Sequence, residues 1–374
     1  MNHKTQSNKI ELKIGKTIIS DKKAAFIVAE AGNNHDGNLK QAFQLIDAAV
    51  LAKADAVKFQ IFKADKLYPP NVRFIDLNNE KLDLFGFLKK SEVNYTWVPK
   101  LKTYCDEKGI IFLATPFDRK SADILEQVGV SAYKVASPEL NHIPLLKHIA
   151  KKGKPMFLSC GLSDLSDIDL AIKTIRAEKN NQIAILHCLS AYPAPAKEYN
   201  LNFIRTLIKV FGVIAGLSDH TTDPALLPTL AVANGARIIE KHLTLNRKLK
   251  GADHFFALEP KELKLMVEKI RHVEKYAEDK KREYISKYEN IMGSYEKTIA
   301  PCERKIYPGD KRSIFSVKAI KKGEKISMKN IDVLRAERFL TPGLHPQYFD
   351  LILGKTSKKN VPIYRGIQWD DILD

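Results

Sequence analysis

Short apolar runs alternate with longer stretches of helical period from residue 25 to about residue 275. Eight apolar runs predict β-strands, at residues 25–32, 55–62, 110–117, 132–137, 155–161, 183–189, 213–220 and 236–244. Eight helices are predicted after them, at residues 39–53, 98–108, 119–128, 144–151, 165–176, 201–210, 224–234 and 260–276. Most of the strands are apolar on both faces, as expected of parallel strands that helices cover. This pattern predicts an α/β fold, a closed (β/α)₈ TIM barrel, with a doubly wound open sheet as the alternative.

The remaining segments suggest a second domain. A long insertion at residues 63–95 follows the second strand, and long loops at the catalytic rim of a barrel are often functional. A charged run and a Pro-containing stretch lead to a compact segment with short apolar runs and many turns. We therefore expect a barrel domain at 1–280, a linker at 281–310 and a small, mostly β domain at 311–374.

Composition and charge narrow the class of protein. Hydrophobic residues make up 44% of the chain, which is typical of a folded domain, and no apolar run approaches the ~18 residues of a membrane span. Four scattered cysteines form neither a disulfide framework nor a CxxC pair, so we expect a cytoplasmic protein. The net charge of +17 is spread along the chain, which favours small anionic substrates over nucleic acid.

Polar side chains interrupt the apolar pattern near the ends of the predicted strands, where the catalytic groups of such barrels lie. They are Glu30, Asn34, Lys58, Gln60, Thr115, Lys134, Ser137, Ser159, Ser190, Tyr192, Ser218, His220 and His242. A lysine buried without an anion costs several kcal/mol, so Lys58 and Lys134 indicate a phosphate or carboxylate ligand. His220 and His242 end neighbouring strands, where they are either buried core residues or two ligands of a divalent metal. Glu30 is the candidate for proton transfer or water positioning.

Two reaction classes do not fit this set of residues. No Gly-rich dinucleotide loop follows the first strand, which argues against hydride transfer. No Gly-x-Ser-x-Gly sequence is present, which argues against serine hydrolysis. A phosphorylated or carboxylated substrate that meets a polarised carbonyl suits the pattern better.

Six motifs in order resemble the sialic acid synthase family. They are IVAEAGNNHDG at 27–37, VKFQ at 57–60, ATPF at 114–117, YKVAS at 133–137, LSDHT at 217–221 and EKH at 240–242. The C-terminal segment is similar to the antifreeze-like (SAF) domain of those enzymes, so the resemblance covers nearly the whole chain. It implies condensation of phosphoenolpyruvate with the aldehyde of an N-acylated mannosamine-type sugar, with loss of phosphate, to give a nine-carbon 2-keto acid for polysaccharide biosynthesis.

The resemblance also assigns roles. His220 and His242 correspond to the ligands of Mn²⁺ or Mg²⁺, which polarises the aldehyde, and Glu30 corresponds to the carboxylate that positions water or moves a proton. The phosphoenolpyruvate pocket corresponds to Lys58, Thr115, Lys134, Ser137, Ser159, Ser190 and Ser218. The sugar side corresponds to Asn34, Gln60, Tyr192 and Asp253. Arg312 resembles the SAF-domain arginine that enters the partner's site in a domain-swapped homodimer.

Some positions depart from the family pattern. Cys160 and Cys188 stand where a threonine is common, and each loses a hydroxyl. The first motif looks less like the pseudaminic type, which favours a neuraminic or legionaminic type of sugar.

Three other readings remain open at the sequence level. A Schiff-base aldolase would use Lys134 as its amine, although such an enzyme needs no metal. A related synthase would condense phosphoenolpyruvate with a phosphorylated sugar. A glycan-binding or ice-binding protein would depend on the C-terminal domain and leave the polar residues of the barrel unexplained.

Overall fold

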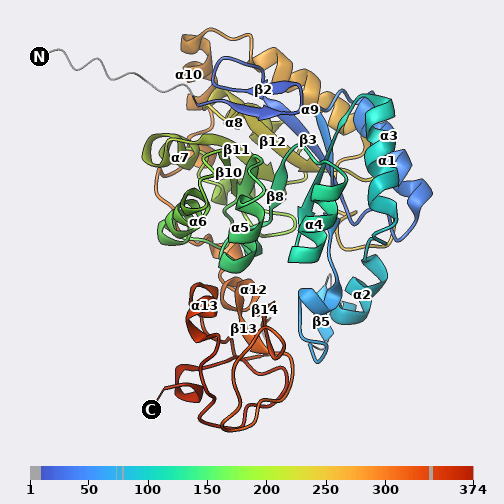
Figure 1. Ribbon diagram of the computed structural model, residues 1–374. Helices are drawn as coiled ribbons and strands as arrows, with labels where there is room; N and C mark the ends of the chain where they lie inside the picture. The colour runs from blue at the N-terminus through green and yellow to red at the C-terminus, as the bar shows by residue number, and fades with distance from the viewer. Residues whose placement is uncertain (1–9, 73, 78–79, 337–339, 374) are drawn as a thin grey trace, which may run out of the picture.

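Eight parallel strands close into a barrel in the computed structural model, which describes residues 10–72, 74–77, 80–336 and 340–373 (Figure 1). The strands follow chain order around the barrel, and the last of them pairs with the first. They are β3 (Phe26–Gly32), β4 (Ala56–Ile61), β7 (Ile111–Pro116), β8 (Tyr133–Val135), β9 (Met156–Ser159), β10 (Ile183–Cys188), β11 (Ile214–Asp219) and β12 (Ile238–His242). The predicted TIM barrel is therefore confirmed, and the open sheet is excluded because β12 pairs with β3.

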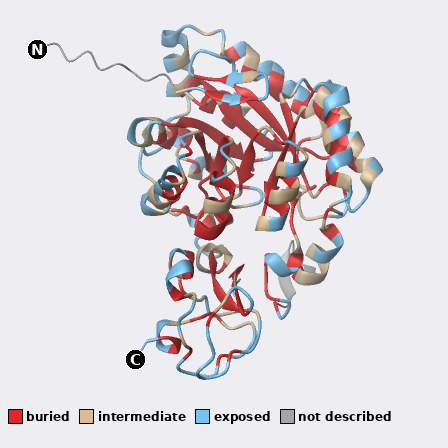
Figure 2. Ribbon diagram, in the orientation of Figure 1, coloured by how far each residue is buried: buried red, intermediate tan, exposed pale blue. Residues whose placement is uncertain are grey.

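Helices surround the barrel, and each covers the outer side of the strands next to it (Figures 1 and 2). They are α1 (Leu39–Leu51), α3 (Trp97–Lys108), α4 (Arg119–Gln127), α5 (Ile143–Ala150), α6 (Leu165–Ala177), α7 (Phe203–Phe211), α8 (Leu226–Ala233) and α9 (Pro260–Val273). Asn38, Asp118 and Asp164 begin three of them, because each side chain accepts hydrogen bonds from the first-turn amides. Gly109 and Gly212 end two others in the left-handed conformation.

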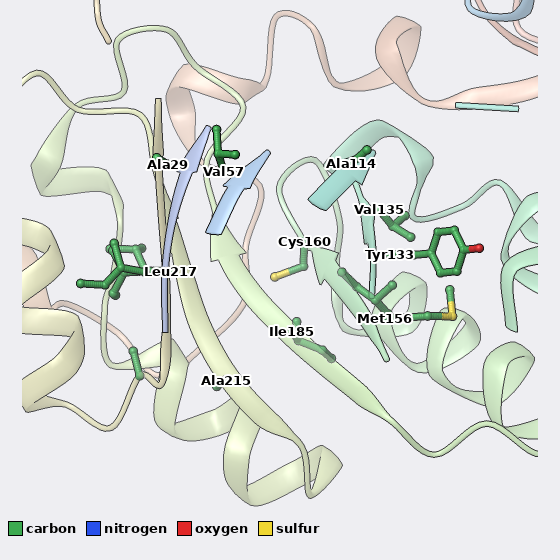
Figure 3. Packing of buried hydrophobic residues seen from close by; sticks show 14 of the residues in the cluster. Ala29, Val57, Ala114, Tyr133, Val135, Met156, Cys160, Ile185, Ala215 and Leu217 are labelled. Atoms are coloured by element: carbon green, nitrogen blue, oxygen red, sulfur yellow. The ribbon is translucent and has the colours of Figure 1, made fainter. Parts of the chain in front are cut away.

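Strand residues alternate between the helical layer and the barrel interior. Outward side chains such as Val57, Val135, Ile185 and Leu217 are apolar and join the main hydrophobic core beneath the helices (Figure 3). This core explains why the strands appear in the sequence as nearly continuous apolar runs.

The inward side chains divide the barrel interior into an apolar floor and a polar mouth. A hairpin of β1 (Leu12–Ile14) and β2 (Thr17–Ile19) belongs to the same apolar cluster as the first inward residues of the strands. Phe26, Phe157 and Ile238 are among those inward residues. The floor is filled so tightly that a Cβ on Gly216 would lie 2.4 Å from Leu186. The hairpin thus closes one end of the barrel and leaves the other end for chemistry.

The insertion and the predicted linker both contain secondary structure. The insertion forms β5 (Phe74–Leu77), β6 (Glu80–Asp83) and α2 (Leu84–Ser91). The stretch after the barrel forms α10 (Glu278–Ser286), α11 (Glu289–Met292), a 3₁₀ turn at Pro301–Glu303 and α12 (Tyr307–Asp310).

The C-terminal domain has an antiparallel pair, β13 (Arg312–Ser316) and β14 (Ile331–Arg335), and a short helix α13 (Phe349–Ile352). Its own hydrophobic core includes Ile314, Val333 and Phe349. No helix in the described part of the chain is long and apolar enough to cross a membrane.

The C-terminal domain contacts the barrel through ion pairs. Both oxygens of Glu139, in the loop after β8, accept hydrogen bonds from the other domain. Arg312 Nε lies 2.7 Å from one oxygen, and Arg335 donates to the other at 2.6 Å. Asp167 of α6 pairs with Lys311, 2.7 Å away. Glu139 is fully buried, so this contact is shielded from solvent at the domain boundary.

Candidate active site

The polar mouth of the barrel is a cavity lined by residues from all eight strands and from the loops that follow them. The predicted site residues that line it are Glu30, Lys58, Gln60, Thr115, Lys134, Ser137, Ser159, Tyr192, Ser218, His220 and His242. Ala136, Pro138, Cys188 and Glu240 complete the lining. Parallel strands bring these positions together because they all end at the same rim of the barrel.

Two lysines and two glutamates form a buried charge network at the centre of the cavity. Lys58 Nζ lies 2.8 Å from Glu30 Oε2 and 3.7 Å from Glu240 Oε1. Lys134 Nζ lies 3.5 Å from the same oxygen of Glu240. Hydroxyls add to the network, since Lys58 donates to Thr115 at 3.2 Å and Lys134 donates to Ser159 at 2.7 Å.

The two lysines differ in their electrostatics. Burial disfavours both ammonium groups, but the carboxylates of Glu240 and Glu30 outweigh it and raise the pKa of Lys58. Burial lowers the pKa of Lys134, and the nearby charge of Lys58 adds to that effect against the attraction of Glu240. The charge of Lys134 is therefore less fully compensated than that of Lys58. An incoming anion should stabilise the ammonium group of Lys134 more than that of Lys58.

The two glutamates also shift in opposite directions. Burial raises the pKa of Glu30 despite the neighbouring Lys58, and the charge of Glu240 raises it further. The pKa of Glu240 is lowered, because Lys134 and Lys58 together outweigh its burial. Gln60 donates to Glu30 Oε1 at 2.9 Å and fixes its orientation. This pairing leaves Glu30 as the carboxylate suited to gaining and losing a proton.

Two imidazoles lie side by side at the rim. The ring centroids of His220 and His242 are 5.3 Å apart, and Tyr192 stacks on His220 at 4.4 Å. Burial lowers the pKa of His220 to about 4 and that of His242 well below its usual range, so both rings are neutral near pH 7. His220 Nδ1 lies 2.6 Å from the carbonyl of Leu189, which makes Nδ1 the donor and leaves Nε2 with a free lone pair.

Asp253 lies next to these histidines without lining the cavity itself. Its Oδ2 is 3.6 Å from His242 Nδ1. Burial, followed by the charge of Glu30, raises the pKa of Asp253 to about 7. Gly32 has a φ of +52°, and a Cβ there would lie 3.3 Å from Asp253 and 3.4 Å from Glu30. A glycine at this position lets the two carboxyl groups approach each other.

The donor set at the rim fits a divalent metal in part. His242 Nδ1 is buried without a hydrogen-bond partner, and both rings are neutral, which is the form that binds metals. No group of three or more His, Cys, Asp or Glu side chains within the described ranges is arranged to hold a metal ion. The site therefore offers two imidazole ligands and leaves other coordination positions to water or substrate.

Three other predicted residues lie outside the cavity lining. Asn34 donates to the carbonyl of Leu243 at 2.9 Å and ties the loop after β3 to β12. Ser190 is buried just behind the lining, beside Ser137. Arg312 lies in the ion pair with Glu139 of its own chain and not in the cavity.

Two functional candidates were missed from the sequence. Glu240 is the shared counter-ion of both lysines, and a charged residue inside an apolar strand was an available signal. Glu303 reaches the mouth from the predicted linker, where no pattern marked it.

Comparisons with known proteins identify the family of this chain. The model of the NeuB family matches residues 45–282, and the model of the SAF domain matches residues 311–373. The chain is similar to the spore coat polysaccharide biosynthesis protein SpsE of Bacillus subtilis, with 45% identity over 351 residues, 93% of each chain. It is also similar to the N,N'-diacetyllegionaminic acid synthase of Legionella pneumophila, with 35% identity over 93% of this chain and 94% of the relative.

Solved structures of related proteins are similar to this chain as well. The crystal structure of SpsE from Bacillus subtilis has a TM-score of 0.85 and 44% identity, covering 97% of this chain and 99% of that one. The N-acetylneuraminic acid synthetase of Leptospira borgpetersenii has a TM-score of 0.66 and 34% identity, covering 75% and 97%. The chain therefore belongs to the NeuB family, and its C-terminal domain is a SAF domain.

Proposed function

We propose that this protein is an acid synthase that condenses phosphoenolpyruvate with an N-acylated mannosamine-type sugar to give a nonulosonic acid. The enol carbon C3 forms a bond to the sugar aldehyde, and water adds at C2. Phosphate then leaves with its bridging oxygen, so phosphoenolpyruvate, aldehyde and water become one 2-keto acid and phosphate. The observation that carries the proposal is the buried lysine pair beside two neutral histidines in one cavity.

The lysines and hydroxyls provide the anion side of the site. Lys58 and Lys134 bind the phosphate and carboxylate of phosphoenolpyruvate, and their partners Thr115 and Ser159 turn toward the ligand with them. Charge-assisted hydrogen bonds from buried lysines hold such an anion strongly.

Glu30 performs the proton transfer at the former enol carbon. It accepts the proton of the water that adds at C2, because burial raises its pKa and makes the carboxylate a stronger base, and Gln60 donates to its Oε1 at 2.9 Å. Lys58, 2.8 Å away, stabilises the carboxylate before it takes the proton.

His220 and His242 are the residues that would hold a divalent metal, Mn²⁺ or Mg²⁺. A metal there would supply a Lewis acid for the sugar aldehyde. Removal of the metal with a chelator should abolish activity, and Mn²⁺ or Mg²⁺ should restore it. Full activity in metal-stripped protein would contradict this assignment.

A neuraminic or legionaminic type of sugar is the proposed substrate. The Ala-Gly-Asn-Asn-His sequence of the first motif supports this choice, as does the similarity to a diacetyllegionaminic acid synthase.

The test measures phosphate released from phosphoenolpyruvate with a panel of sugars. Release should require an N-acylated mannosamine-type aldehyde and should yield a nine-carbon 2-keto acid. Release only with a phosphorylated sugar would favour the related synthase class. A borohydride-trapped adduct at Lys134 would establish the Schiff-base aldolase instead.

A further inference from the structure

One carboxylate in the segment between the two domains enters the barrel mouth from behind the cavity. Glu303 is the last residue of the 3₁₀ turn at Pro301–Glu303 and has no exposed surface. The segment is anchored there, because the amide of Cys302 donates to Glu198 at 2.8 Å. Glu303 therefore occupies a defined position.

A single oxygen of Glu303 joins the ends of two neighbouring strands. Oε1 accepts the amide of Leu162, in the loop after β9, at 2.8 Å. It also accepts the amide of Ser190, in the loop after β10, at 2.8 Å. No cation pairs with Glu303 among the described residues, so its hydrogen bonds to the backbone are its main partners.

The same oxygen lies beside the hydroxyls of the anion side. Gly161 shows this best, because a Cβ there would lie 2.7 Å from Ser190 Oγ, 2.9 Å from Ser137 Oγ and 3.1 Å from Glu303 Oε1. Ser137 Oγ accepts the amide of Gly161 at 3.0 Å. Ser190 Oγ is buried and has no hydrogen-bond partner in the described structure. A buried hydroxyl without a partner is available to a ligand.

We propose that Glu303 is a positioning residue that fixes the loops after β9 and β10, so that Ser190, and Ser137 through the amide of Gly161, are ordered for the phosphoenolpyruvate anion. The inference rests on the proposed function. Glu303 lies nine positions before Arg312 of the SAF domain. The position of the segment between the domains therefore affects the order of the serines in the anion-binding part of the site. Without the carboxylate oxygen, two buried amides lose their common acceptor and the two loops lose their common anchor.

The experiment compares E303A and E303Q with the wild type. A matched control is E296A, which changes an exposed glutamate of the same segment. Binding of phosphoenolpyruvate is measured by calorimetry, KM and kcat by phosphate release, and protection of the Leu162 and Ser190 amides by hydrogen exchange. E303A should weaken binding and raise KM roughly tenfold or more, with a smaller change in kcat. E303Q should stay within about threefold, because an amide oxygen accepts the same two hydrogen bonds.

Each result separates the possibilities. Folded E303A with unchanged affinity, whatever its melting temperature, would overturn the positioning role. Tighter binding by E303A would overturn it too, because Glu303 would then be competing with the anion. E303Q as weak as E303A would rule out the hydrogen-bond explanation. If E303A does not fold, the E303Q result and its amide protection decide the question. A wild type that does not bind phosphoenolpyruvate would instead overturn the proposed function.

Discussion

Lys58 and Lys134 are the same residue type in the same cavity, but they pair with different numbers of carboxylates. Loss of each lysine should therefore change the stability of the folded protein by a different amount. Lys58 is held between Glu30 and Glu240, whereas among the described residues Glu240, 3.5 Å away, is the one carboxylate that pairs with Lys134. A site that needs cations for an anionic substrate must keep them charged while it is empty, and Glu240 provides this for both.

The first prediction compares K58M with K134M. Each loses a charged hydrogen bond to phosphoenolpyruvate worth ~1.5–3 kcal/mol, so the KM should rise roughly ten- to hundredfold in steady-state kinetics. Urea unfolding should separate them, because only K58M leaves Glu30 without its cation, and a broken buried pair costs about 3–5 kcal/mol. The exposed control K269M should match the wild type. Equal stability of K58M and K134M would argue against the observed pairing.

The second prediction concerns Asp253, whose pKa is raised to about 7 in the folded protein. Between pH 4 and 7 the native state binds a proton that the unfolded chain has released, so the free energy of unfolding falls as pH rises. One unit between the two pKa values corresponds to about 1.4 kcal/mol. In metal-stripped protein, the free energy of unfolding of D253N should not show this decrease between pH 4 and 7.

The comparison with D253N is needed because the histidines act with the opposite sign. His220 has a lowered pKa, so its contribution to stability rises with pH between about 4 and 6.5. Urea unfolding of both proteins at several pH values isolates the carboxyl contribution. Parallel pH profiles would show that Asp253 titrates normally.

At the scale of elements, the sequence predicted the eight strands and eight helices because parallel strands covered by helices form continuous apolar runs. It missed the hairpin of β1 and β2, because two three-residue strands that include Lys13 look like a polar leader. It predicted most of the cavity lining, since polar residues are conspicuous at the ends of apolar strands. Glu303 could not be predicted, because its position depends on the path of the chain after the barrel.

The third prediction tests the hairpin as the floor of the barrel. Ile14 is fully buried in the floor cluster, so I14A should lower the free energy of unfolding by roughly 2–5 kcal/mol. The KM for phosphoenolpyruvate should remain within about twofold, because the floor lies at the end of the barrel opposite the cavity. Urea unfolding and steady-state kinetics check the two parts. A large change in KM with unchanged stability would contradict the floor role.

At the scale of the whole molecule, one fully buried carboxylate of the barrel binds two arginines of the C-terminal domain. Glu139 accepts hydrogen bonds from Arg312 and Arg335, and these cations outweigh burial to lower its pKa. Ser137 lies two positions earlier in the same loop, so the domain contact is next to the cavity.

The fourth prediction is that E139A weakens this contact. Buried Arg312 would lose its anion, at about 3–5 kcal/mol, and Arg335 would keep, among the described carboxylates, only Asp310, 3.4 Å away, so the SAF domain should detach at a lower temperature than the barrel unfolds. Calorimetry should then show two transitions, and proteases should cut within residues 293–310 more quickly. The double variant E139A/R312A should be less unstable than the two single losses added together. Additive losses would show that the pair is not coupled.

The domain-swapped homodimer predicted from the family resemblance has its own test. In such a dimer Arg312 acts at the partner's site, so mixing R312A with H242A under conditions of subunit exchange should restore about a quarter of wild-type activity. No recovery after proven exchange would mean that Arg312 serves its own barrel.

The barrel closes where its last strand meets its first, and the active site lies across that seam. His242 and Glu30 are register partners there, and the amide of Leu243 donates to the carbonyl of Glu30 at 2.7 Å. A chain still on the ribosome presents Glu30 long before His242 has been synthesised. Unfinished chains and fragments that end before β12 therefore lack His242 and cannot form the active site. We expect them to be unable to consume phosphoenolpyruvate until synthesis of the barrel is complete.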